Sequence, residues 1–300
     1  MIKEISLLAA IVLLVLTATA TGIFYRTSGT DIEYVSIRGQ STVYQGSGLY
    51  QYNPVSFVRE GIIWDFINLF IALPLFVIAA IGSIYDSLRA RLLLGGMLAY
   101  FFYVYLSSVM MYTFNILFLV YVAIFSLSAV MFVNNMTKIN ILELPVRLKT
   151  RLPRRLFVGY AFIFAVSLVA LWIVRIVPLM RTGLFPEGFI GLHTLGSQAL
   201  DLGLIVPLAL ATGVLLHKQS PWGYYLCSLA MVIGLMMFIS IPAWITVPLI
   251  QDGKADLFEA VPFFALSVAG IALAVTFYLN ISGRTRRGDS IEESSSIDNR

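Results

Sequence analysis

The chain has 300 residues, of which 59% are hydrophobic and only 12% are charged. Soluble domains carry about a quarter of charged residues, so this composition excludes an ordinary soluble protein and indicates an integral membrane protein. The formal net charge of +4 does not predict a nucleic-acid partner, because the basic residues lie in loops between apolar segments. The single cysteine, Cys227, lies within an apolar segment and cannot form an intrachain disulfide.

A helix needs about 20 mostly apolar residues to cross the hydrocarbon core of a bilayer. The sequence contains eight such segments and therefore predicts an all-α membrane protein with eight transmembrane helices, at 5–25, 62–83, 92–112, 114–133, 156–178, 198–216, 222–246 and 258–281. The first segment has a competing interpretation as a signal peptide, cleaved after Ala18-Thr19-Ala20. Its apolar run continues to Phe24, which is long for a signal peptide, so we favour a retained helix.

The segment 26–60 is the one long polar loop between apolar segments. Apolar and polar residues alternate over Glu33–Arg38, which is typical of a strand, and Gly39 supplies a turn. A second strand is expected at Ser41–Gln45 or at Leu49–Tyr52. We expect a small extracellular β-hairpin that caps the bundle; an irregular loop anchored by its tyrosines is the alternative.

The distribution of basic residues predicts the orientation in a cell membrane. The segment 134–155 is the most basic loop and is expected to be a cytoplasmic connector. With this connector inside, the cytoplasmic side has thirteen basic residues: Lys3, Arg89, Arg91, Lys138, Arg147, Lys149, Arg151, Arg154, Arg155, Lys218, Arg284, Arg286 and Arg287. The outer side has five: Arg26, Arg38, Arg59, Arg181 and Lys254. Both termini are therefore expected in the cytoplasm, with 282–300 as a disordered tail.

The two halves of the chain, 1–133 and 156–281, each contain four predicted spans. The second span of each half has an acid near its outer end, followed by a Pro-Leu pair that starts at Pro74 in the first half and at Pro207 in the second. This match favours a 4+4 parallel tandem repeat; chance similarity between apolar helices is the alternative, since the spacings between acid and proline differ by three residues. Each proline is expected to disturb its helix.

Ionisable and polar groups inside membrane spans are costly and by default indicate function. Seven such candidates are expected near the outer ends of the spans or just above them, namely Asp65, Asn68, Asn115, Arg175, His193, Gln198 and Asp201. Within the pairs Asp65/Asn68 and Gln198/Asp201, the three-residue spacing puts both side chains on one helix face. One interpretation is an outward-facing polar pocket with an Arg175–Asp201 contact. The other is that the charges reach the membrane interface as structural groups with one ion pair.

No metal or cofactor site is predicted. The histidines His193 and His217 are expected on opposite sides of the membrane, so they cannot jointly bind a haem, and the sequence has no HExxH, P-loop or CxxC motif. The aromatic run Tyr100–Tyr105 could line a groove for a lipid, a quinone or a carotenoid, although core packing is the commoner role of such a run.

Several stretches resemble a family of uncharacterised multi-pass prokaryotic integral membrane proteins with eight helices. They are GLYQY at 48–52, SLRARLLLGGMLAYFFYVY at 87–105, FLVYVAIFSLS at 118–128, LPRRLF at 152–157, QALDLGLIVPLAL at 198–210 and SPWGYYL at 220–226. The resemblance implies the same membrane fold and brings with it no activity, substrate or cofactor.

Three functions fit this sequence. The first is a translocator of a small solute or an ion, and the second is a non-catalytic membrane subunit or sensor that binds a partner or ligand through its hairpin. The third, which we favour less, is an outer-leaflet lipid-modifying enzyme with Asp65 or Asp201 as base. All three place the chain in the lipid bilayer, with an unknown small solute or protein as partner and with assembly into a homo-oligomer left open.

Overall fold

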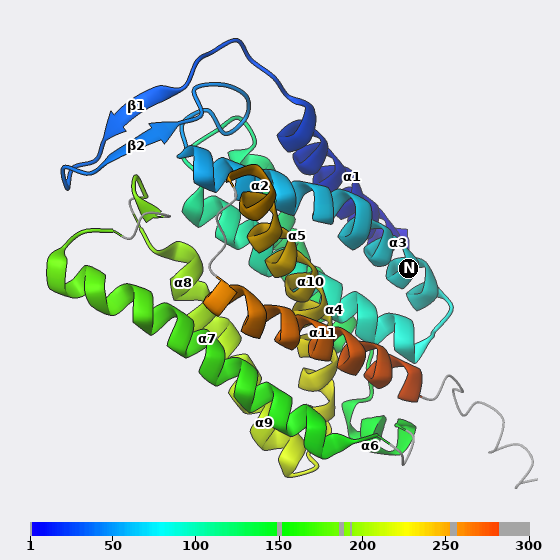
Figure 1. Cartoon of the computed structure of the whole chain (residues 1–300). Coiled ribbons are helices and arrows are strands. Elements are labelled where there is room, and N and C mark those ends of the chain that lie inside the picture. The colour runs from blue at the N-terminus through cyan, green and yellow to red at the C-terminus, as the bar shows by residue number, and fades with distance from the viewer. Residues whose placement is uncertain (1, 149–151, 186–188, 193, 253–256, 282–300) are drawn as a thin grey trace, which may run out of the picture.

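The computed structural model describes residues 2–148, 152–185, 189–192, 194–252 and 257–281, and 77% of the chain is helical. Figure 1 shows a bundle of long helices with a small two-stranded sheet at one end. The elements are α1 (Ile2–Phe24), β1 (Ile32–Val35), β2 (Ser41–Tyr44), α2 (Val55–Ile67), η1 (Asn68–Ala72), α3 (Leu73–Ile84), α4 (Leu88–Met111), α5 (Phe118–Met136), η2 (Ile141–Glu143), α6 (Leu144–Arg147), α7 (Arg154–Thr182), α8 (Gly196–Leu200), η4 (Asp201–Ile205), α9 (Val206–His217), α10 (Pro221–Asp252) and α11 (Leu257–Asn280).

A helix is present in each of the eight segments predicted to be apolar spans. Among the described residues, six helices are long and apolar enough to cross a membrane: Ile2–Phe24, Val55–Ile84, Leu88–Met111, Phe118–Met136, Arg154–Thr182 and Gly196–His217. Two shorter apolar stretches, Pro221–Met237 and Phe264–Asn280, lie within α10 and α11. The prediction of a helical, membrane-embedded protein with a small sheet is confirmed.

Two of the long helices contain a π turn immediately before a proline. In η1, which joins α2 to α3, the N–H of Leu73 bonds the carbonyl of Asn68, five residues earlier. In η4, which joins α8 to α9, the N–H of Val206 bonds the carbonyl of Asp201 in the same way. A proline has no N–H and crowds the carbonyl four residues before it, so a wider turn reroutes the backbone hydrogen bonds without ending the helix. The disturbance expected at each proline takes this form.

The polar loop after α1 forms the predicted hairpin, with β1 and β2 antiparallel. The register pairs Ile32 with Tyr44 and Val35 with Ser41. Of the two positions expected for the second strand, the structure uses the earlier one. Because the turn begins directly after Val35, the first strand ends before the predicted Arg38.

The helices before the connector (α1–α5, the N-terminal helices) and those after it (α7–α11, the C-terminal helices) meet at α4 and α10. Helix α4 packs on α3, α5, α8 and α10, and helix α10 packs on α9, α11, α2 and α4. The two central helices approach closely at Gly96, where an added Cβ would lie 2.5 Å from the Cβ of Val232. A side chain at this position would separate the two sets of helices.

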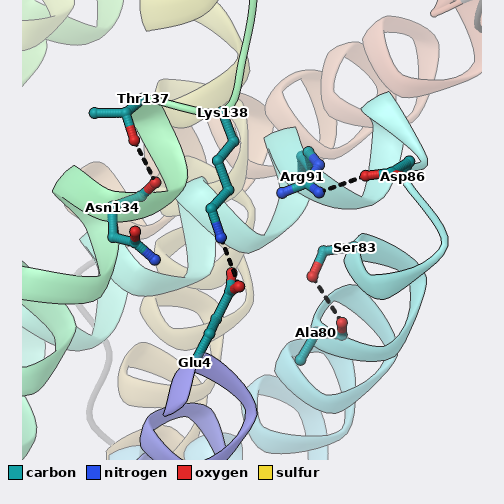
Figure 2. A network of polar contacts seen from close by, with 8 residues as sticks. All are labelled: Glu4, Ala80, Ser83, Asp86, Arg91, Asn134, Thr137 and Lys138. Atoms are coloured by element: carbon teal, nitrogen blue, oxygen red, sulfur yellow. Dashed lines mark hydrogen bonds and ion pairs between the residues drawn. The ribbon is translucent and has the colours of Figure 1, made fainter. Parts of the chain in front are cut away.

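The end of the bundle opposite the hairpin is held together by polar contacts (Figure 2). Lys138, which follows α5, forms an ion pair with Glu4 in the first turn of α1. Arg89 in α4 donates to the backbone carbonyl of Ile281, directly after α11. The start of α1, the start of α4, the end of α5 and the end of α11 therefore lie at one end of the bundle.

Candidate functional site

A cavity of about 380 Å³ lies between α2 and α4 on one side and α7 and α8 on the other. Its lining includes Tyr50 and Phe189 from loops near the hairpin. Along α7 the lining runs from Phe164 to Arg175, which is about 16 Å of helix. The cavity therefore reaches from the hairpin end of the bundle down to the two π turns. Five of the seven predicted polar residues line it: Asp65, Asn68, Arg175, Gln198 and Asp201.

The N-terminal helices contribute Asp65 and Asn68. Asp65 is buried and accepts a hydrogen bond of 2.7 Å from the phenol of Tyr50. Burial, and then the charge of Asp65, raise the pKa of Tyr50 above its ordinary value, so this phenol remains a donor. An added Cβ at Gly22 of α1 would lie 1.9 Å from Oδ2 of Asp65, so a glycine is needed here. Three residues beyond Asp65, Asn68 accepts a 2.7 Å hydrogen bond from Tyr100.

The C-terminal helices contribute Asp201, which is also buried. Its carboxylate accepts hydrogen bonds from the phenol of Tyr103 and, at 2.9 Å, from the indole N–H of Trp172. The guanidinium of Arg175 lies 5.6 Å from the ring centroid of Trp172 and 5.8 Å from that of Phe189. The predicted Arg175–Asp201 ion pair does not form, because Asp201 is bonded to Tyr103 and Trp172, and Arg175 stacks over Trp172 instead.

A third carboxyl group, that of Glu60, also lines the cavity, and the sequence analysis did not single it out. Glu60 interacts with Trp64 and lies within electrostatic range of Arg175 and Asp201. The predicted span began at residue 62, whereas the helix begins at Val55, so Glu60 was assigned to the loop. The signal was present in the sequence, since a four-residue spacing puts Glu60 and Trp64 on the same helix face.

Three buried polar atoms at the cavity wall have no hydrogen-bond partner among the described residues. They are the hydroxyls of Tyr105 and Tyr121 and Oε1 of Gln198, and each residue is only 3% exposed. Leaving such an atom unsatisfied costs about 1–3 kcal/mol. All three residues line the cavity.

One predicted site residue of the described chain is not among those that line the cavity. Asn115 uses its Oδ1 to accept the backbone N–H of Leu117, just before α5. This contact between residues two apart in the chain is a local turn that short polar side chains commonly form. His193 lies outside the described residues.

The hairpin is attached to the α7–α8 loop beside the cavity. Three hairpin side chains bond the backbone of that loop: Arg38 to the carbonyl of Gly183 at 2.6 Å, Gln40 to Phe185 in both directions at 2.9 Å, and Tyr44 to the carbonyl of Gly191 at 3.0 Å. Burial, and then the neighbouring Tyr34, raise the pKa of Tyr44, so its phenol stays a donor. The hairpin thus links the N-terminal helices to the loop that carries Phe189 of the cavity lining.

A constant sequence offset relates the two helices that contain π turns. Pro207 follows Pro74 by 133 positions. Asp201 follows Asn68, and Gln198 follows Asp65, by the same number of positions. All four of these polar residues line the cavity. The pattern of an acid before a Pro-Leu pair matches Asp65 with Asp201, whereas the register of the π turns matches Asp201 with Asn68.

The same offset of 133 positions relates Asp86 to Gln219 in the turns that follow these two helices. These are the two non-glycine residues with positive φ in the described chain, at 54° and 57°. Such a conformation is uncommon for residues other than glycine. Its recurrence at two positions that share the offset therefore supports a similarity between the two turns. In each turn the backbone N–H of this residue bonds the carbonyl three residues earlier, on Ser83 and on Leu216.

The cavity lining contains carboxyl, amide, hydroxyl and aromatic groups. The described residues contain no group of three or more His, Cys, Asp and Glu side chains that could hold a metal ion. Asp65 and Asp201 are bonded to neutral phenol and indole donors. The cavity therefore combines buried carboxyl groups with hydrogen-bonding groups and aromatic walls.

No protein-family model matches the sequence, and comparisons with curated proteins and with solved structures found no match.

Proposed function

We propose that this chain is a membrane-embedded translocator of a small solute, and that the cavity is its outward-facing substrate site. One observation carries the proposal. Two π turns, each followed by a proline, deliver polar side chains to the same cavity from the N-terminal and from the C-terminal helices. In many secondary transporters the substrate site lies between two repeats, beside interrupted helices.

In this proposal the two sets of helices are tandem repeats of four spans each, and all eight long helices cross the bilayer. The offset of 133 positions between the π turns supports the repeat. The packing supports it as well, since α4 packs on α3, α5 and α8, while α10 packs on the corresponding α9, α11 and α2. An even number of spans in each repeat gives both repeats the same orientation.

We place the hairpin outside the cell membrane, and both termini and the connector in the cytoplasm. The connector and the residues beside it at that end of the bundle carry most of the basic side chains of the short loops. The preference of Lys and Arg for cytoplasmic loops supports this orientation.

The packing below the cavity supports an outward-facing state. Phe76 of α3, together with Met97, Leu98 and Phe101 of α4, lies between the π turns and the connector end, and all four side chains are fully buried. A transporter must close one side of its site while the other is open, and this packed region would form the inner closure.

The test is solute uptake into proteoliposomes that contain the purified protein. A panel of radiolabelled amines, amino acids, sugars and carboxylates is presented with and without a proton gradient. We expect saturable accumulation of one class, lost in Asp201→Asn. The matched control is Glu143→Gln, because Glu143 is an exposed carboxylate at the opposite end whose surface ion pair with Arg147 contributes little stability.

A folded Asp201→Asn variant that transports like the wild type would reject the cavity as the substrate site. Absence of uptake for every class, with the protein folded and correctly inserted, would reject translocation.

A second candidate function is a subunit or sensor that binds a partner through the hairpin. It is favoured by an exposed apolar surface on the hairpin, which comprises Val35, Ile37 and Val43, with Ile37 90% exposed. Substituting all three residues by serine would abolish partner capture if this function holds, and would leave solute uptake unchanged if the chain is a translocator.

A further inference from the structure

We infer that the ligand of the cavity is a small organic cation with an ammonium group, held between aromatic rings and buried carboxylates. This inference rests on the proposed function for the role of the cavity and adds the chemical class of the solute. It follows from the balance of charges, the composition of the wall and the unpartnered polar atoms.

In the described part of the chain, the charged side chains that line the cavity do not balance. They are three carboxyl groups, Glu60, Asp65 and Asp201, and one guanidinium, that of Arg175. Glu60 lies within electrostatic range of Arg175. Among the described residues, Asp65 and Asp201 take part in no ion pair and accept hydrogen bonds from phenol and indole groups alone.

A buried carboxylate without a cation is costly, because neutral donors replace only part of the hydration that burial removes, and such a group otherwise takes up a proton. A monovalent cation in the cavity would stabilise the ionised form of one of the two aspartates. An anion in the same place would oppose that ionisation, and a neutral molecule would give it no such stabilisation.

The wall of the cavity suits an ammonium group in particular. Ten of the 27 described residues that line it are aromatic. Aromatic cages recognise quaternary and methylated ammonium groups through cation–π attraction, which is strongest where water is excluded. The structure already contains this interaction at the rim, where Arg175 lies over the rings of Trp172 and Phe189.

The size and the polar atoms of the cavity define the rest of the ligand. A volume of about 380 Å³ is at the lower end of the range for small-molecule sites. The hydroxyls of Tyr105 and Tyr121 offer donors on the wall, and Oε1 of Gln198 offers an acceptor. They fit an amine that carries one further polar group.

The test measures binding of three probes of similar size to the purified full-length protein in detergent. The probes are benzyltrimethylammonium as cation, benzyl alcohol as neutral aromatic molecule and benzoate as anion, and titration calorimetry gives each dissociation constant. We expect saturable binding of benzyltrimethylammonium at least tenfold tighter than that of either other probe. Binding of benzoate or benzyl alcohol as tight as that of the cation would overturn the inference, and this comparison needs no variant.

The variants Asp65→Asn and Asp201→Asn test whether the cation binds beside these two carboxyl groups. Each should weaken benzyltrimethylammonium at least tenfold with little change for benzyl alcohol, whereas Glu143→Gln should change neither. Full-strength cation binding in both folded aspartate variants would reject the site.

The uptake assay keeps this inference distinct from the proposed function. Cation binding without transport would reject translocation and keep the ligand class. Transport of a sugar or a carboxylate would keep translocation and reject the ligand class.

Discussion

The hydroxyl groups of Tyr100 and Tyr225 are both buried in the bundle, and they differ in one respect. The phenol of Tyr100 donates to Oδ1 of Asn68 at 2.7 Å, whereas the phenol of Tyr225 has no hydrogen-bond partner among the described residues. Both rings are almost completely shielded from solvent. Comparing these two residues therefore separates the stability contributed by a hydrogen bond at the π turn from the stability contributed by a buried aromatic ring.

We expect Tyr100→Phe to lower the free energy of unfolding by about 1–3 kcal/mol, because it leaves the amide oxygen of Asn68 without this donor in a buried site. The control Tyr225→Phe should be neutral or slightly stabilising, since it removes a hydroxyl that lacks a partner. Thermal unfolding in detergent, followed by tryptophan fluorescence, measures both. An equal loss in the two variants would contradict a specific role of the Tyr100–Asn68 bond.

At the scale of elements, the hairpin joins two parts of the chain that are far apart in sequence. It leaves the N-terminal helices after α1 and bonds the backbone of the α7–α8 loop through Arg38, Gln40 and Tyr44. The opposite hairpin face, which includes Glu33 and Val43, is exposed. The hairpin is therefore positioned to hold the loop beside the cavity.

Gln40→Ala removes both hydrogen bonds between this side chain and the backbone of Phe185. We expect exchange of the Phe185 amide hydrogen to accelerate about tenfold, as the loss of one or two bonds of about 1 kcal/mol implies. Hydrogen–deuterium exchange with mass spectrometry measures the change. The control Glu33→Ala, on the exposed face of β1, should leave the rate as in the wild type. Equal exchange in Gln40→Ala and the wild type would show that other contacts hold the loop.

For the whole molecule, the structure puts the hairpin and α6 at opposite ends of the bundle (Figure 1). The long apolar helices run between these ends, as expected for a protein that spans the bilayer. Cys227 is buried, so introduced cysteines can report sidedness against a low background. Ile37 in the hairpin is 90% exposed and Val146 in α6 is 86% exposed, which makes both accessible to a reagent.

In intact cells, a membrane-impermeant maleimide should label Ile37→Cys and should label Val146→Cys only after permeabilisation. This outcome follows from the proposed orientation, which has the basic connector in the cytoplasm. Labelling of the wild type reports the background from Cys227. Labelling of Val146→Cys alone in intact cells would reverse the proposed orientation, and labelling of both would contradict an odd number of membrane crossings between the two sites.

The sequence by itself determined the membrane class, the positions of the long helices, the hairpin and most of the polar residues at the cavity. These features follow from local properties, because hydrophobic length, turn residues and the cost of a buried charge depend on short stretches of chain.

The tertiary structure decided which of those polar residues share a cavity. It added Glu60 to the cavity lining, and it gave Asn115 a local turn contact with Leu117. It replaced the expected Arg175–Asp201 pair by contacts through Trp172, and it matched Asp201 with Asn68. These outcomes depend on helix rotation and on contacts between distant segments, and a π turn rotates every residue beyond it in a way that hydrophobic periodicity does not reveal.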